Sequence, residues 1–203
     1  VKSPQPPFVK GGVILSSPMK LFFDLCLSQN IIGVTGTKGK GTTASLIYEI
    51  LKKDGKGVWL GGNIGVAPFS FIDKIKQHDW VVLELASFQL EDMTASPHIA
   101  VISNLSPEHL KPADPINPNY HKNLKDYYNA KLNIIKYQKP GDKAVLNQES
   151  SPFAKALEDK GIKNQALEKG QKVFFTKSDL PSKLIGEHNK ENIGAAVAVA
   201  KIV

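Results

Sequence analysis

Residues 36–43 have the composition and order of a phosphate-binding loop. The run reads Gly36-Thr37-Lys38-Gly39-Lys40-Gly41-Thr42-Thr43, and it follows a short apolar stretch at 31–35. Glycines let the backbone present successive N–H groups to phosphate oxygens, and a helix that follows adds its positive N-terminal end. Lys40 then lies where its amine could reach the β- and γ-phosphates of a nucleotide, while a hydroxyl just inside the helix could hold Mg²⁺.

The run departs from the generic loop pattern at two positions. Val34 stands where the first glycine belongs, and Gly41 stands where Ser or Thr follows the lysine, so that Thr42 becomes the expected magnesium ligand. A glycine-rich turn without phosphate binding is the alternative interpretation. The strand before the run, the helix after it and the position of Lys40 favour a phosphate loop.

Two residues near the ends of predicted strands could also bind metal. Glu84 closes the apolar run 80–83, and His109 lies in the loop after the strand predicted at 99–103. A carboxylate at Glu84 could complete the oxygen shell that Mg²⁺ prefers. Taken singly, each is a weak signal, because a strand-end Glu is commonly solvated and a loop His commonly has no role.

Lys131 falls on the apolar stripe of the helix predicted at 123–138, in register with Leu124, Tyr128 and Ile135. From spacing alone, the favoured interpretation is a lysine with a buried stem and a solvated amine. A desolvated amine, however, has a lowered pKa and is nucleophilic. Such an amine could take up CO₂ as a carbamate, which is a metal ligand.

The last predicted helix opens with a polar cluster that contains His188, Asn189 and Asn192. His188 and Asn192 are four residues apart and so share a helix face. Amides on that face could hydrogen-bond the edge of a purine. A cluster that caps the helix N-terminus is the equally good alternative.

Short apolar strands alternate with helices along the chain, and this pattern predicts the scaffold for these residues. It indicates an α/β fold, with a mostly parallel sheet covered by helices on both faces. Ligands bind such sheets at the carboxyl ends of the strands. We expect strands at 31–35, 58–60, 80–85, 99–103, 144–146 and 173–175, and helices at 18–27, 42–53, 123–138 and 187–203.

Composition excludes several classes of protein. The 203 residues are 41% hydrophobic and 22% charged, which suits one globular domain or one domain with a piece of another. No apolar run reaches the ~18 residues of a membrane span. The net charge of +7 comes from lysine without any arginine, which disfavours base-edge reading of nucleic acid. A single cysteine, Cys26, predicts a reducing, cytoplasmic location. The ends of the chain lead us to expect a piece of a longer protein.

Several motifs together, in this order and spacing, resemble the Mur ligase family. They are Gly33–Lys40, Gly62–Gly65, Glu84–Glu91, Asn104–Leu110, Tyr127 with Ala130-Lys131, and Gly186–Asn189 with Asn192. The Gly-Asn-Ile-Gly and Ser-Phe-Gln-Leu-Glu segments resemble the D-glutamate-adding (MurD) type in particular. The resemblance implies that residues 1–27 end an N-terminal UDP-sugar-binding domain and that 28–203 form the central ATP-binding domain of this P-loop fold. It also implies that the C-terminal, amino-acid-binding domain is absent here.

The resemblance also implies roles for individual residues. ATP would be held at its phosphates by Gly36, Thr37, Lys38, Gly39, Lys40, Gly41 and Thr42, and at its adenine by His188, Asn189 and Asn192. One Mg²⁺ would be bound by Thr42 and Glu84, and a second by His109 and carbamylated Lys131. The substrate's reacting end would lie near Asn63, Ser87 and Gln89. Lys40, Glu84, His109 and Lys131 would be the catalytic set.

The resemblance to the D-glutamate-adding type implies the ATP-dependent addition of D-glutamate to UDP-N-acetylmuramoyl-L-alanine through an acyl phosphate, for peptidoglycan synthesis. Gly41, Ala86 and Glu108 depart from the MurD pattern and bear on the metal and substrate sites. A folylpolyglutamate synthase-like ligase is a second interpretation, favoured by Lys40-Gly41-Thr42. A nucleotide-binding module without ligase activity is a third. Oligomeric state stays open.

Overall fold

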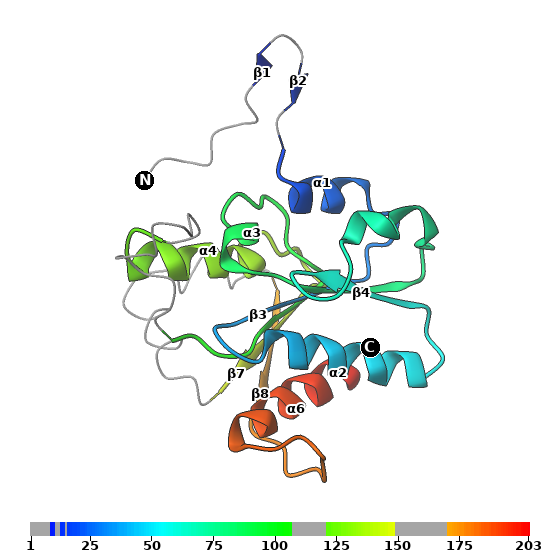
Figure 1. Ribbon diagram of the computed structural model, residues 1–203, viewed down its shortest axis with the longest axis vertical. Helices are drawn as coiled ribbons and strands as arrows, with labels where there is room; N and C mark the ends of the chain where they lie inside the picture. Colours follow the sequence, from blue (N-terminus) through cyan, green and yellow to red (C-terminus); the bar gives the residue numbers. More distant parts are fainter. Residues whose placement is uncertain (1–8, 11–12, 15, 107–120, 149–169) are drawn as a thin grey trace.

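The computed structural model describes residues 9–10, 13–14, 16–106, 121–148 and 170–203. Its centre is a six-stranded sheet with the order β4-β5-β3-β6-β7-β8, in which all neighbouring strands are parallel (Figure 1). The strands are β3 (Ile31–Thr35), β4 (Val58–Gly62), β5 (Trp80–Glu84), β6 (Ile99–Ile102), β7 (Lys143–Asn147) and β8 (Gln171–Phe175). This confirms the predicted parallel sheet.

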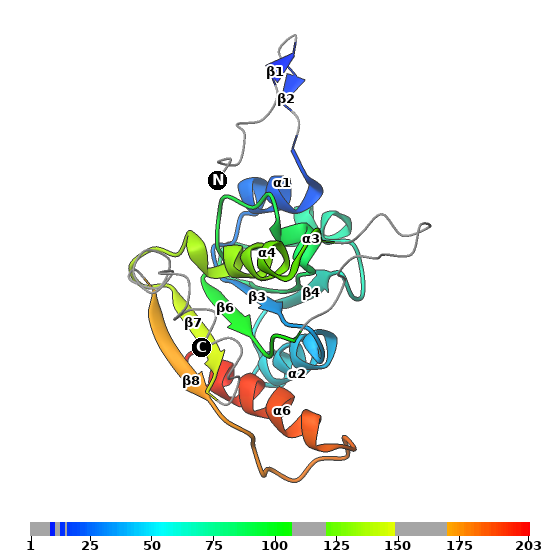
Figure 2. The same ribbon diagram turned by 90° about the vertical axis from the view of Figure 1, so that its left-hand side faces the viewer.

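Helices cover both faces of this sheet, as predicted. Figure 2 shows α1 (Pro18–Leu25), α3 (Ser87–Leu90) and α4 (Leu124–Lys136) on one face, and α2 (Lys40–Lys53) and α6 (Glu187–Ala200) on the other. Two 3₁₀ turns, η1 (Pro68–Ser70) and η2 (Ile72–Lys74), follow β4. Two short strands, β1 (Val9–Lys10) and β2 (Val13–Ile14), pair antiparallel before α1. No described helix is long and apolar enough to cross a membrane.

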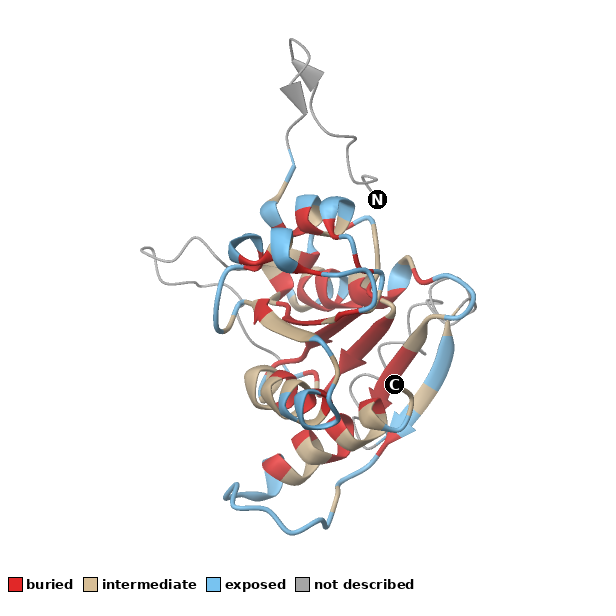
Figure 3. Ribbon diagram, turned by 90° about the vertical axis from the view of Figure 1, so that its right-hand side faces the viewer, coloured by how far each residue is buried: buried red, intermediate tan, exposed pale blue. Residues whose placement is uncertain are grey.

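The central strands are buried on both faces of the sheet, because successive side chains point into two different hydrophobic cores. In β5, Val81 and Leu83 pack beneath α1 and α4, whereas Val82 packs against α2 and α6. Figure 3 shows the central strands buried along their length. Each fully buried Val or Leu side chain is worth ~1.5–3 kcal/mol of hydrophobic free energy, so the two cores fix the register of the sheet.

Helix α1 joins the first of these cores. Phe22 is fully buried and meets Phe69 and Phe71 edge to face, at centroid distances of 6.0 and 6.4 Å. Residues assigned to the end of a preceding domain therefore pack on the sheet domain. The boundary at residue 28 stays a prediction.

Most predicted bounds differ from the observed ones by one to three residues, and two of these differences lie near the carboxyl edge of the sheet. Helix α2 starts at Lys40, two residues earlier than predicted, and β4 continues through Gly61-Gly62 instead of ending at Leu60. Gly62 has a φ of 105° and lies so close to the backbone of Glu84 that a Cβ atom would collide with it. Gly61 and Gly62, which the predicted strand at 58–60 left to the following loop, are thus strand residues, and at Gly62 only glycine permits this approach.

Candidate functional site

The phosphate-loop residues connect the carboxyl end of β3 to the start of α2, and the end of β6 holds their shape. The Oδ1 atom of Asn104 accepts hydrogen bonds from the amides of Thr37 (3.2 Å) and Lys38 (2.9 Å). The Nδ2 atom of Asn104 donates to the Lys38 carbonyl at 2.9 Å, and Ser103 Oγ donates to the same carbonyl at 3.2 Å. The amides of Thr37 and Lys38 are thus already engaged within the protein.

The start of α2 combines the first amides of a helix with a lysine side chain. Gly39 has a left-handed φ of 76°, and the first i→i−4 bond of the helix runs from Thr43 N to Gly39 O at 2.9 Å. The amides of Lys40, Gly41 and Thr42 therefore have no partner within the helix. Lys40 Nζ donates to the Thr37 carbonyl at 2.9 Å, so the only lysine of the first turn folds back over the loop. These groups suit a phosphate.

Glu84 lies against this helix start. The sheet register pairs it with Val34 of β3 and with Gly62 of β4. Its side chain is buried, and Oε1 accepts a hydrogen bond from Asn63 Nδ2 at 3.3 Å. A Cβ atom on Gly41 would lie 3.0 Å from Glu84 Oε2 and 2.7 Å from Ile64 Cδ1. Position 41 therefore faces the Glu84 carboxylate, but Gly41 has no hydroxyl. Thr42 is the next residue along the helix.

Lys131 is buried, with 2% of the residue exposed, as its position on the apolar stripe of α4 predicted. Its Nζ atom donates to the carbonyl of Gly36 at 2.7 Å and lies 4.9 Å from the centre of the Tyr127 ring. The solvated amine favoured from spacing alone is therefore wrong. The packing of α4 on the sheet brings this amine to the phosphate loop across 95 residues of sequence.

Asn189 and Asn192 are buried at the start of α6, next to the loop. Asn192 Oδ1 accepts from Thr43 Oγ1 at 3.2 Å, and its Nδ2 atom donates to Asn189 Oδ1 at 2.9 Å. A Cβ atom on Gly39 would collide with the Asn192 amide. His188 is exposed. A cap for the N-terminus of α6 does not account for the whole cluster, because Asn192 also bonds α6 to α2. An adenine contact stays a prediction.

The three residues expected near a substrate lie after β4 and β5, in different settings. Asn63 is exposed, Gln89 is half-buried with its Oε1 atom accepting from Ala86 N at 2.9 Å, and Ser87 is buried. Ser87 Oγ lies 2.9 Å from His121 Nε2. His121 was missed from the sequence, because a single histidine has no spacing signal. The contact exists only in the folded protein.

Tyr127 is a second residue to which sequence reasoning gave no role. Its hydroxyl lies 2.9 Å from Thr37 Oγ1, which also donates to the Ser106 carbonyl at 2.9 Å and accepts from Ser106 N at 2.9 Å. Tyr127 therefore ties α4 to the phosphate loop. Its place on the apolar stripe concealed this, since only the hydroxyl is polar.

The second predicted metal site cannot be built from these contacts. His109 and Glu108 lie outside the described residues. Within the described ranges, His, Cys, Asp and Glu side chains form no group of three suited to a metal ion. The expected pairing of His109 with Lys131 thus stays a prediction.

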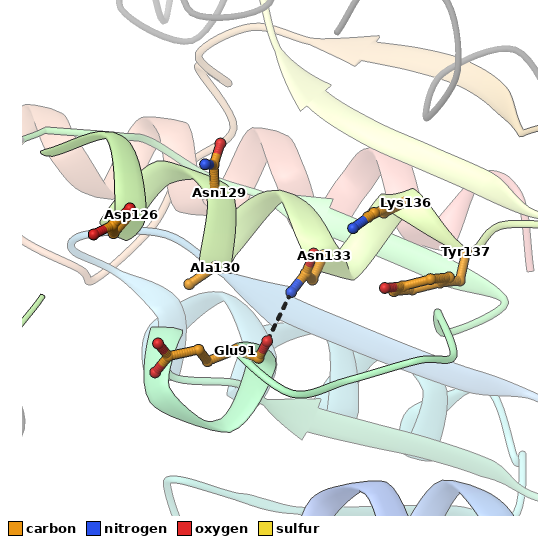
Figure 4. Close-up of a pocket in the computed structure, with 7 residues that line it drawn as sticks. All are labelled: Glu91, Asp126, Asn129, Ala130, Asn133, Lys136 and Tyr137. Atoms are coloured by element: carbon orange, nitrogen blue, oxygen red, sulfur yellow. Dashed lines mark hydrogen bonds between the residues drawn. The ribbon is translucent and has the colours of Figure 1, made fainter. Parts of the chain in front are cut away.

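A polar groove of about 240 Å³ lies on the outer side of α4, apart from the predicted site residues. Figure 4 shows Asn133 closing one part of it through a hydrogen bond from Nδ2 to the Glu91 carbonyl, at 3.1 Å. The groove is lined by Glu91, Asp126, Asn129, Ala130, Asn133, Lys136 and Tyr137. None of these side chains reaches the phosphate loop, so we do not include the groove in the site.

A parallel sheet with this loop, its lysine and a buried strand-end carboxylate defines the class of α/β domains that carry a phosphate-binding loop. The Mur ligase middle domain model matches residues 34–200. The chain belongs to the Mur ligase family.

Curated relatives are similar over most of the chain. A UDP-N-acetylmuramoylalanine–D-glutamate ligase of Acetivibrio thermocellus is 40% identical over 92% of this chain and 42% of its own length. The enzyme of the same name from Clostridium kluyveri is 41% identical over 97% of this chain and 45% of its own length. The chain thus spans less than half the length of these relatives.

Solved structures share the fold at low identity. MurF from Acinetobacter baumannii has a TM-score of 0.64 at 18% identity, covering 91% of this chain and 45% of its own. MurF from Thermotoga maritima in complex with ADP has a TM-score of 0.62 at 21%, covering 91% and 47%. Escherichia coli FolC in complex with ADP has a TM-score of 0.56 at 17%, covering 91% and 57%. These values support the fold alone.

Proposed function

We propose that the protein catalyses the ATP-dependent addition of D-glutamate to UDP-N-acetylmuramoyl-L-alanine, and that this chain supplies the ATP-binding part. The observation that carries the proposal is the convergence of the α2 N-terminus, Lys40 and the buried Glu84 at one edge of the sheet. The D-glutamate ligases at about 40% identity support this amino acid over others. UDP-muramoyl-L-alanine and D-glutamate would be its small-molecule partners.

The residues present fit a magnesium nucleotide. The first-turn amides of α2 and the Lys40 amine offer positive charge to phosphate oxygens. Glu84 offers oxygens of the kind that Mg²⁺ prefers, and Asn63 fixes one of them through its Nδ2 atom. Thr42 would complete this first metal site, because position 41 has no hydroxyl. When bound, the metal neutralises charge on the transferred phosphoryl group.

Lys131 fits the second metal only if its charge is reversed. As an ammonium, held 2.7 Å from the Gly36 carbonyl, it would repel a cation. A carbamate on Nζ would instead present oxygens beside the loop, together with His109. The position of Nζ supports this step, because its contact with the Gly36 carbonyl at 2.7 Å would put a carbamate beside the phosphate loop.

The remaining roles follow from position. Asn189 and Asn192, with His188 at the helix start, would meet adenine at the α6 end of the loop. Ser87, Gln89 and Asn63 would meet the substrate carboxylate where β4 and β5 end. That carboxylate attacks the γ-phosphorus, ADP leaves, and the amine of D-glutamate then attacks the acyl phosphate and releases phosphate.

The test is phosphate release by the full-length protein. We expect release only when ATP, Mg²⁺, UDP-muramoyl-L-alanine and D-glutamate are all present. Replacing D-glutamate by L-glutamate or meso-diaminopimelate should remove it. Release that requires a folate and L-glutamate would instead establish the folylpolyglutamate synthase-like alternative. ATP binding without release on any of these substrates would favour a nucleotide-binding module.

A further inference from the structure

His121 lies three residues before the start of α4, and aromatic and polar side chains surround it. Its imidazole is buried, with 3% of the residue exposed, and Nε2 lies 2.9 Å from the Oγ atom of Ser87, which is 2% exposed. The ring stacks on Phe88 with centroids 4.7 Å apart and planes within 7°. Tyr127 meets it edge-on at 5.4 Å. These contacts fix both the position and the plane of the imidazole.

Ser87, which His121 contacts, lies at the edge of the sheet where the proposed function places the reaction. Ser87 is the first residue of α3 and follows Glu84 of β5 by three positions. His121 comes from a segment 34 residues further along the chain. Folding has thus placed an imidazole on the hydroxyl that the proposed function assigns to the acyl substrate.

The chemistry of the hydroxyl decides which partner must donate. Serine has one proton to donate and two lone pairs to accept with, whereas a carboxylate can only accept. If Ser87 gave its proton to the imidazole, its lone pairs would face the substrate carboxylate. If the imidazole donates from Nε2, the Ser87 proton remains for the carboxylate.

We propose that His121 is a positioning residue whose Nε2–H donates to Ser87 Oγ, so that the Ser87 hydroxyl donates its proton to the carboxylate of the acyl substrate. The inference rests on the proposed function, because it takes that substrate to be a carboxylate. Phe88 and Tyr127 hold the ring so that the donor stays aimed at Ser87. His121 itself touches neither substrate nor nucleotide.

A double-mutant cycle in the full-length protein tests this coupling. His121→Phe keeps an aromatic ring but removes the donor, and Ser87→Ala removes its partner. We expect each to lower kcat/KM for UDP-muramoyl-L-alanine by about 10- to 100-fold, the size of one lost hydrogen bond to a charged group. The KM for ATP should stay within about twofold. The double variant should be no worse than Ser87→Ala.

His121→Gln is the conservative control, since the glutamine amide can donate from near the Nε2 position. It should recover at least part of the activity that His121→Phe loses. Losses that multiply in the double variant would overturn the inference, because they would show that His121 acts without Ser87. A rise in the KM for ATP as large as the loss in kcat/KM for UDP-muramoyl-L-alanine would overturn it too, since it would indicate general damage to the site.

A second measurement needs neither substrate nor a stable variant. ¹⁵N NMR of the imidazole in the wild-type protein should report the Nε2–H tautomer. The Nδ1–H tautomer would overturn the inference whatever the substrate. Wild-type protein with the Nε2–H tautomer but no turnover on UDP-muramoyl-L-alanine would instead refute the proposed function, so that the two failures are distinguishable.

Discussion

Replacing Lys40 by alanine removes the amine that the proposed function aims at the nucleotide phosphates. In the structure this amine donates one of the three N–H groups of an ammonium to the Thr37 carbonyl at 2.9 Å, so the others remain for phosphate oxygens. A hydrogen bond from an ammonium to a phosphate is worth ~1.5–3 kcal/mol. At the lower end of that range, Lys40→Ala should weaken ATP binding about tenfold.

Lys38 provides a matched control within the same loop, because the phosphate contact expected of this residue is made by its backbone and not by its side chain. Its side chain is exposed, whereas its backbone is held by Asn104, and Lys38→Ala leaves that backbone bonding in place. Both variants lose one positive charge, so long-range attraction for the nucleotide falls equally. We therefore expect Lys38→Ala to change the affinity by less than about twofold, an effect that added salt should screen.

Isothermal titration of Mg-ATP into each protein measures both effects, and a thermal unfolding curve checks that each variant is folded. Unchanged affinity in Lys40→Ala would refute the phosphate-loop assignment. Equal weakening in both variants would show that net charge alone, without an aimed amine, attracts the nucleotide.

Three further changes test the surroundings of the loop. Gly39→Ala should lower the free energy of unfolding by at least about 1–2 kcal/mol, measured by chemical denaturation, because a left-handed φ of 76° and the nearby Asn192 amide exclude a Cβ atom. Lys131→Arg should abolish most turnover in the full-length protein, since a guanidinium cannot be carbamylated, and short carboxylates should partly restore Lys131→Ala; wild-type turnover in Lys131→Arg would exclude the carbamate. Gly41→Ser should lower the Mg²⁺ concentration needed for ATP binding, because it sets a hydroxyl beside Glu84; an unchanged requirement would place the metal elsewhere.

The sheet and its edge could be predicted because strand burial leaves a strong sequence pattern. The run Val81–Leu83 is apolar throughout since both of its faces are covered, and Glu84 is the last residue of the strand. Parallel pairing then requires Glu84 and the loop after Thr35 to meet at one edge. Periodicity likewise placed Lys131 inside, because the stripe of α4 faces the sheet.

The contacts between distant side chains could not be predicted in the same way. Nothing in the sequence links His121 to Ser87, since the pairing depends on how α3 and α4 pack. Gly62 was mistaken for a loop residue because its strand conformation depends on the Glu84 backbone beside it. Spacing favoured a solvated amine for Lys131, whereas in the structure this amine donates to the Gly36 carbonyl of the loop instead of to water.

The phosphate loop is held in shape by three elements that are far apart in the chain. Asn104, which follows β6, accepts a hydrogen bond from the loop backbone. Tyr127 of α4 contacts the Thr37 hydroxyl, and Asn192 of α6 accepts a hydrogen bond from the Thr43 hydroxyl. A loop fixed in this way loses little conformational entropy when a nucleotide binds, which favours affinity. It also limits Asn192, whose oxygen is held by Thr43 and whose nitrogen already donates to Asn189. An adenine contact from Asn192 must use its second amide hydrogen or the second lone pair of its oxygen, or displace one of these bonds, so that purine recognition and the shape of the loop are coupled.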